Sequence, residues 1–199
     1  MKKNKLASRI VIVTIGVILA GVILFWFLFL GGFPKVITDA EEYGKFNGFL
    51  GYSNLMIFPE KLSDNVESVE YYYYNRDTFM DPTCQIYLEC AYDKKTFEEE
   101  CKRLGEIQVT YGEEIKSIIY DEENFNYPAY ISISNWSGCD EYALILEDKN
   151  TIIYVFTQGI SANRQKLAKE YLPLNKVEKR ESYSIYSFDG YFQQRYLEK

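Results

Sequence analysis

The sequence predicts an α+β fold, in which a single N-terminal transmembrane helix precedes one domain with a mainly antiparallel sheet and about two covering helices. Three observations predict it. Residues 10–30 contain no charged side chain, six later segments are rich in Tyr, Ile or Val, and two further segments show helical patterns. Strands connected by short turns, with few helices between them, are typical of an antiparallel α+β domain.

Residues 10–30 are predicted to cross a membrane once. A 21-residue helix is about 31 Å long at ~1.5 Å per residue, which matches a hydrocarbon core of ~30 Å. A signal peptide would have a shorter apolar region, ~7–15 residues, followed by small residues, but here the segment ends in Phe27-Leu28-Phe29-Leu30-Gly31-Gly32-Phe33. A buried core helix is seldom apolar on every face. The pattern therefore favours an uncleaved membrane anchor.

The distribution of cations predicts the orientation of this anchor. Lys2, Lys3, Lys5 and Arg9 precede the apolar segment, whereas only Lys35 follows it closely. Lys and Arg near a membrane span tend to remain in the cytoplasm. We expect a type II protein in the cell membrane, with a cytoplasmic tail at residues 1–9, a juxtamembrane connector at 31–52 and an extracytoplasmic domain at 53–199.

Composition excludes several classes of function. All 29 acidic residues and 18 of the 22 basic ones follow Pro34, so the part outside the membrane has a net charge of −11. Such a charge argues against a nucleic-acid partner. The chain contains no histidine, which excludes Ser-His-Asp and Cys-His hydrolases and histidine-ligated metals. The catalytic groups that remain for an enzyme are carboxylates, thiolates, lysines and tyrosines.

The elements of the domain are predicted from local patterns. A short helix is expected after Thr38, and an entry strand at Ser53–Leu62. The capped segment Lys94–Leu104 and the segment Ser161–Tyr171, which Pro173 ends, are the predicted helices. The polar sequence Asp148-Lys149-Asn150 predicts a hairpin turn between the last two of six main strands. These strands are Val66–Asn75, Gln85–Tyr92, Ile115–Tyr120, Ala129–Ser134, Glu141–Glu147 and Thr151–Thr157, and a final strand is expected at Ser182–Phe188.

Four cysteines, Cys84, Cys90, Cys101 and Cys139, all lie in the predicted outer domain. An oxidising compartment would allow two disulfides in three connectivities, and a bridge between Cys90 and Cys101 is geometrically reasonable if their strand and helix are neighbours. Buried free thiols are the alternative. A four-thiolate metal site is disfavoured by the wide spacing, and we predict no cofactor or metal.

Tyrosine is the most unusual excess, with 19 residues that include the run Tyr71-Tyr72-Tyr73-Tyr74 in a predicted strand. Strand alternation places two of these rings on each face. If helices cover only one face, the other pair forms an exposed aromatic platform, and Trp136 lies in a loop between two strands where binding residues often occur. We therefore take these five aromatic residues as candidates for binding, although core packing also explains them.

No sequence motif identifies a reaction. Acidic groups recur along the chain, but none has the spacing of a calcium loop or a glycosidase pair, and a solvated surface explains them. We expect residues 10–30 to contact membrane lipid and the outer domain to serve binding or assembly, with a protein partner or a second copy. The alternative is a histidine-free, carboxylate-based hydrolase that acts on envelope material.

Overall fold

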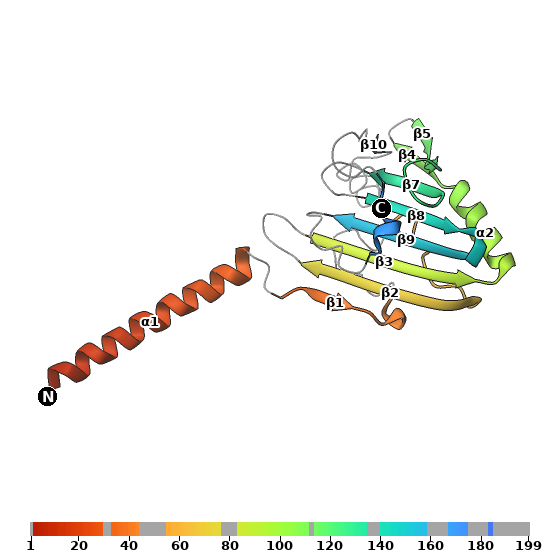
Figure 1. Cartoon of the computed structure of the whole chain (residues 1–199). Helices are drawn as coiled ribbons and strands as arrows, with labels where there is room; N and C mark the ends of the chain where they lie inside the picture. The colour runs from red at the N-terminus through yellow and green to blue at the C-terminus, as the bar shows by residue number, and fades with distance from the viewer. Residues whose placement is uncertain are drawn as a thin grey trace.

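The computed structural model begins with a long apolar helix, α1 (Lys2–Phe29) (Figure 1). A 20-residue stretch of it, Ser8–Phe27, has a mean hydropathy of 2.9, and none of this stretch is buried against the rest of the protein. The helix is therefore long and apolar enough to cross a membrane. The structure describes residues 2–29, 33–43, 55–76, 83–111, 114–134, 140–158, 167–174 and 183–184.

The domain is built on an eight-stranded antiparallel sheet, which confirms the predicted α+β class. Its strand order is β1-β2-β3-β9-β8-β7-β10, with β6 also paired to β7, and β4 and β5 form a separate hairpin. The strands are β1 (Lys35–Ile37), β2 (Val66–Arg76), β3 (Thr83–Tyr92), β4 (Gln108–Tyr111), β5 (Glu114–Ser117), β6 (Ile119–Asp121), β7 (Ala129–Ser134), β8 (Asp140–Leu146), β9 (Thr151–Gln158) and β10 (Tyr183–Ser184).

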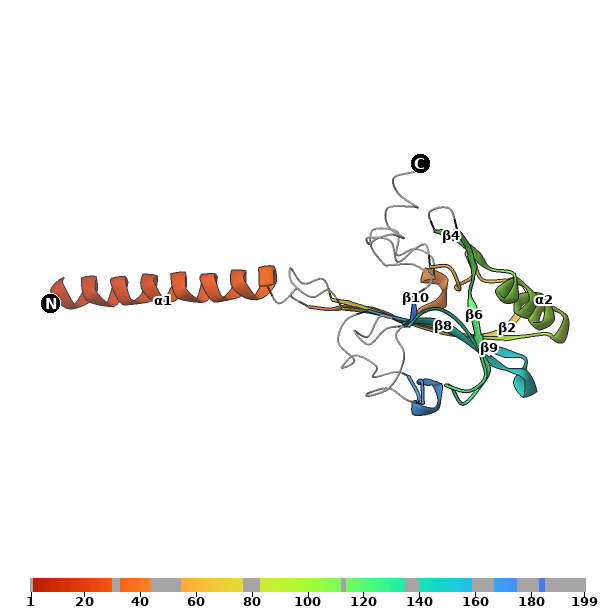
Figure 2. The ribbon, with the colours of Figure 1, turned by 90° about the horizontal axis from the view of Figure 1, so that it is seen from above.

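Both faces of the sheet are covered, and each has its own apolar cluster (Figure 2). The first, which we call the α2 face, packs against α2 (Lys94–Gly105), the 3-10 helix η1 (Ala40–Glu42) and residues 55–62. The second, the far face, packs against Phe125 and the segment 167–174. Residues of either face alternate along each strand, as the pleat of a sheet requires.

The sheet begins earlier in the chain than residue 53. Strand β1 lies within the range 31–52, where the sequence predicts a connector, and it pairs with β2 through Lys35↔Asn75, Val36↔Tyr74 and Ile37↔Tyr73. The β-branched side chains of this short segment suit an edge strand. Only the residues between Phe29 and Lys35 therefore separate the apolar helix from the sheet.

Helix α2 is confirmed with nearly its predicted bounds. Asp93 is the N-cap, and its side chain accepts hydrogen bonds from the backbone N–H groups of Lys95 and Thr96, which satisfies donors that have no partner within the helix. Phe97 and Leu104 are buried against the sheet. The predicted turn between β8 and β9 is also present, as the 3-10 helix η3 (Glu147–Lys149) followed by Asn150 in the left-handed region at φ 46°.

Three predicted elements differ in the structure. Residues 55–62 form bends instead of an entry strand, because side chains from β8 and α2, and not a neighbouring strand, bind the backbone of Ile57. The predicted strand Ile115–Tyr120 divides into β5 and β6. In the second predicted helix, Ser161–Tyr171, residues 161–166 lie outside the described residues and only a 3-10 turn, η5 (Lys169–Tyr171), follows. The carbonyls of Glu170 and Tyr171 accept bonds from distant side chains, which favours a packed loop here.

Residues 55–59, which we call the strap, cross the α2 face and place Ile57 in the core with no exposed surface. Both backbone groups of Ile57 bind side chains far away in the sequence. Its N–H donates to the buried Glu141 Oε1 at 2.8 Å, and its carbonyl accepts from Arg103 Nη2 at 2.6 Å. The second oxygen of Glu141 accepts from Ser132 Oγ at 2.5 Å. The strap is thereby joined to β8, β7 and α2.

Replacement of Glu141 by Leu should destabilise the domain by about 2–4 kcal/mol, because the Ile57 N–H and the Ser132 hydroxyl would both lose their acceptor in the core. Urea unfolding of the full chain in detergent measures this change. The matched control is Glu147→Leu, since Glu147 is exposed at the other end of β8. Equal unfolding midpoints for the two variants would contradict the role assigned to Glu141.

Candidate functional site

The tyrosine run alternates between the two faces as predicted, but it does not form an exposed platform. Tyr71 and Tyr73 lie on the α2 face with 2% and 1% of their surface exposed. Tyr72 lies on the far face with 8% exposed, beside the half-buried Tyr74. The expected open pair is missing because the far face has its own covering layer. Trp136 lies outside the described residues.

The predicted bridge between Cys90 and Cys101 is not formed, and both residues are free thiols. Cys90 is fully buried on β3 and has a hydrogen bond with Tyr92, while Cys101 is half-buried on α2. Burial raises the pKa of Cys90 to about 12 and that of Cys101 to about 11. Thiols that stay protonated at neutral pH are poor nucleophiles. Cys139 lies outside the described residues.

A chain of hydrogen bonds connects α2 to the sheet. Tyr154, fully buried on β9, donates to Glu100 Oε1 at 2.6 Å, and Tyr92 lies 3.2 Å from the Tyr154 hydroxyl. Arg103 binds both oxygens of Glu100, at 2.8 Å from Nε and 2.6 Å from Nη2. Glu100 therefore binds Arg103 of its own helix and Tyr154 of the sheet at the same time. Burial raises the pKa of both tyrosines, and the Glu100 carboxylate raises it further.

Perturbed tyrosines beside a carboxylate and a guanidinium are the kind of group that active sites contain. Here, however, each member has a structural partner, and the Arg103 guanidinium also holds the strap carbonyl. A hollow of about 400 Å³ adjoins this network and is lined by Glu99, Lys102, Arg103, Glu106 and Ile107. The Lys102–Glu106 pair within it is exposed at 3.8 Å and contributes little energy. The network therefore holds α2 against the sheet, and we call its residues Glu100, Arg103 and Tyr154 the clasp.

A second polar group lies at the end of the sheet where β2 and β9 finish and β3 begins. Five buried side-chain atoms there have no hydrogen-bond partner: Asn75 Oδ1, Arg76 Nε, Gln85 Nε2, Gln85 Oε1 and Gln158 Oε1. Tyr71 Oη is the remaining atom of this kind in the described part of the chain. An unpaired buried polar atom costs about 1–3 kcal/mol. Two of the five atoms lie on the α2 face and three on the far face, so they form two separate groups at this end of the sheet.

The strand register divides these residues between the two faces of the sheet. Asn75 pairs with Cys84, which pairs in turn with Gln158, so Asn75 and Gln158 share the α2 face two strands apart. Gln85 and Arg76 lie on the far face. We call these four residues the amide site. No sequence motif marks it, and the only signal in the chain is the presence of amide side chains within otherwise apolar strands.

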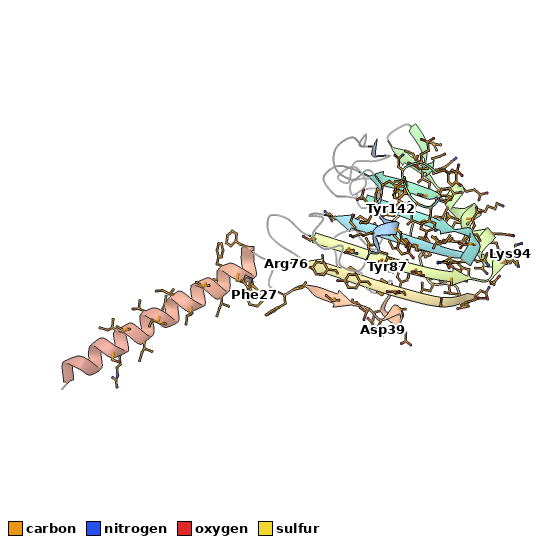
Figure 3. All side chains as sticks on the ribbon, viewed as in Figure 1. Phe27, Asp39, Arg76, Tyr87, Lys94 and Tyr142 are labelled. Atoms are coloured by element: carbon orange, nitrogen blue, oxygen red, sulfur yellow. The ribbon has the colours of Figure 1, made fainter. Side chains whose placement is uncertain are left out.

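The amide site lies at the end of the sheet nearest the apolar helix. Asn75 pairs with Lys35, the first residue of β1, and Figure 3 shows Arg76 at the same end of β2. Six peptide links join Phe29 to Lys35, and an extended chain covers at most about 3.6 Å per residue. Lys35 therefore lies within about 22 Å of the end of α1.

Comparison with known proteins identifies no relative. No protein-family model, no curated protein and no solved structure matches this chain.

The cysteines should be unreactive in the folded protein. At pH 8 we expect maleimide to label Cys101 slowly and Cys90 more slowly still, since burial keeps both thiols protonated. In urea both should react fully, and the protein should migrate equally on reducing and non-reducing gels. Mass spectrometry of the labelled peptides measures each rate. Rapid labelling of Cys90 under native conditions would contradict its placement in the core.

Stability should decline in alkali. Tyr154 and Tyr92 have raised pKa values in the folded state, whereas an unfolded tyrosine ionises near pH 10. Their contribution is therefore complete below about pH 10 and is lost as the pH rises above it. Urea unfolding between pH 8 and pH 11 measures the decline. Tyr154→Phe should be less stable at pH 8 but should lose less stability above pH 10, and parallel profiles for the two proteins would refute this assignment.

Proposed function

We propose that the chain is a single-pass membrane protein that presents a ligand-binding domain outside the cytoplasm. The observation that carries the proposal is the apolar stretch Ser8–Phe27 of α1, none of which is buried and which ends close to the edge strand of a well-packed sheet, six peptide links after Phe29. A helix of this hydropathy is compatible with the hydrocarbon core of a lipid bilayer. Residues 10–30 would contact lipid along their whole length.

The cations at Lys2, Lys3, Lys5 and Arg9 support a cytoplasmic N-terminus. The net charge of −11 beyond Pro34 supports a domain that remains in solution, since anionic lipid would repel it. The cell membrane is the corresponding location. Self-association is part of the proposal, because Gly16 and Ala20 give α1 a small-residue surface and nothing lies within 4 Å of a Cβ added at Gly16.

The position of β1 favours an anchor over a cleaved signal sequence. Lys35 already pairs with β2, so a cleavage that leaves the sheet intact must fall before Lys35. The small residues next to the sheet are Gly31 and Gly32, but the residues two positions before them, Phe29 and Leu30, are large, whereas an Ala-x-Ala-like cleavage site has small residues at both positions.

A topology experiment tests the proposal. We expect the full chain to stay in the membrane fraction after alkaline carbonate, at the mass of the uncleaved protein, with a C-terminal reporter that is active outside the cytoplasm. The double variant Ile15→Arg, Leu19→Arg should leave the membrane fraction, because each central Arg costs about 2.5–3.5 kcal/mol on insertion. Thr14→Ala, in the same turn, is the matched control and should behave as wild type.

Two outcomes would contradict the proposal. Loss of the first ~30 residues from the mature protein would identify a signal sequence. Reporter activity in the cytoplasm alone would show the opposite orientation and would contradict the proposal that the domain is extracytoplasmic.

A further inference from the structure

Aromatic rings gather where α1 ends, and Figure 3 shows Phe27 at this end of the helix. Phe25 and Phe29 stack there, with ring centroids 4.8 Å apart. Phe33 follows the helix, yet its ring lies 4.9 Å from that of Trp26, edge to face at 90°, and 6.3 Å from that of Phe27. We call Trp26, Phe27 and Phe33 the aromatic cluster. The chain beyond the helix therefore contributes a ring to the last turns of α1.

The aromatic cluster has a large apolar surface that the domain does not cover. Phe33 is 76% exposed and Phe27 is 52% exposed. Trp26 is half-buried, whereas the other side chains that the structure describes between Ser8 and Phe29 are all exposed. Removing a phenylalanine side chain from water contributes about 1.5–3 kcal/mol. An exposed patch of this kind marks a surface that contacts a membrane or another protein.

The residue types and their positions fit the boundary between lipid chains and head groups. Tryptophan is enriched at this depth, because its ring is apolar and its N–H needs an acceptor. Arg9 and Phe27 are 18 residues apart, about 27 Å along a helix at ~1.5 Å per residue, close to the ~30 Å of a hydrocarbon core. Lys35, the first charged residue after the apolar segment, is exposed two residues beyond Phe33. A lysine there can extend its ammonium group to the lipid phosphates.

The position of Phe33 also determines how far the sheet can lie from the bilayer. Lys35 begins β1, and two residues of extended chain cover at most about 7 Å. With Phe33 at the lipid boundary, the β1 end of the sheet lies beside the head groups. The opposite end is distant, because Thr83, opposite Arg76, begins β3 and Tyr92 ends it, about 30 Å away at ~3.3 Å per residue.

We infer that the aromatic cluster binds the head-group boundary of the bilayer and thereby holds the β1 end of the domain at the membrane surface. The inference rests on the proposed function, because it takes α1 to span the membrane. Lipid is the partner because the cluster continues the exposed apolar surface of α1 without interruption. The Trp26 indole donates to a lipid carbonyl, and the rings of Phe27 and Phe33 lie among the first carbons of the acyl chains.

The test uses three full-length proteins that each contain one tryptophan, in phosphatidylcholine liposomes. The first carries Trp136→Phe and retains Trp26. The second carries Trp26→Phe, Phe33→Trp and Trp136→Phe, which exchanges the two rings of the contacting pair. The third is the control and carries Trp26→Phe, Lys94→Trp and Trp136→Phe, because Lys94 is exposed at the end of the sheet away from α1 (Figure 3). The quenchers are phosphatidylcholines brominated in the upper or the lower half of the acyl chains.

In the first two proteins, lipid brominated in the upper half should quench the emission at least about twofold more strongly than lipid brominated in the lower half, since rings in contact lie at one depth. Neither lipid should change the emission of the control. The first protein has an unchanged α1 and connector, so its result stands even if the exchanged pair disturbs the chain.

Stronger quenching of Trp26 by the lower half would place the cluster deep in the hydrocarbon and would overturn the inference. Quenching of Trp26 without quenching of the Phe33→Trp protein would overturn it too, because the connector would then leave the surface. A blue-shifted Trp26 emission that neither lipid quenches would show that a second copy, and not lipid, covers the cluster. In all three cases α1 stays in the membrane, whereas loss of the protein from carbonate-washed membranes would instead contradict the proposed function.

Discussion

The hydrogen bonds to the backbone of Ile57 are the interaction on which the domain depends. The strap has no helix or strand of its own, yet it covers the α2 face and fills its core with Ile57 and Phe58. A buried segment without regular structure must have its peptide groups satisfied by other parts of the chain. Glu141 and Arg103 do this from β8 and α2, at separations of 84 and 46 residues. The strap, the helix and the sheet are thereby stabilised together.

Two groups of polar side chains lie in different parts of the domain. The clasp of Glu100, Arg103 and Tyr154 lies where α2 packs, whereas the amide site lies at the opposite end of the strands, toward α1 (Figure 1). Each residue of the first set has a hydrogen-bond partner, and the set stabilises the fold. The second set contains unpaired buried atoms, and each of them reduces the stability of the fold.

Local patterns in the sequence are sufficient to predict much of the fold. The apolar helix, the strands around Tyr71 and Ile153, helix α2 with its Asp93 cap and the turn at Asn150 all follow from periodicity, capping or turn chemistry. Patterns failed where distant contacts decide the outcome. Residues 55–62 are apolar and resemble a strand, but side chains from β8 and α2 bind the Ile57 backbone. The segment at Tyr171 resembles a helix end, but Asn126 and Tyr142 bind its carbonyls.

Sequence patterns predict less of the candidate site than of the fold. The sequence of the tyrosine run predicts the alternation of its side chains between the two faces, but their exposure depends on what covers the far face. That layer comes from residues about 50 and 100 positions later, Phe125 and the segment 167–174. Gln85 carries no motif at all. Only the strand register shows that its carboxamide lies in the core beside Arg76 without a partner.

Hydrogen exchange of the full chain in nanodiscs tests the central claim most directly. Because the Ile57 N–H binds a buried carboxylate that ties the strap to the sheet, this amide should exchange only on global unfolding, as slowly as the amides of β3 and β9. Exchange of the Ile57 amide at the rate of an open loop, with β3 and β9 still protected, would show that the strap detaches independently and would contradict the account.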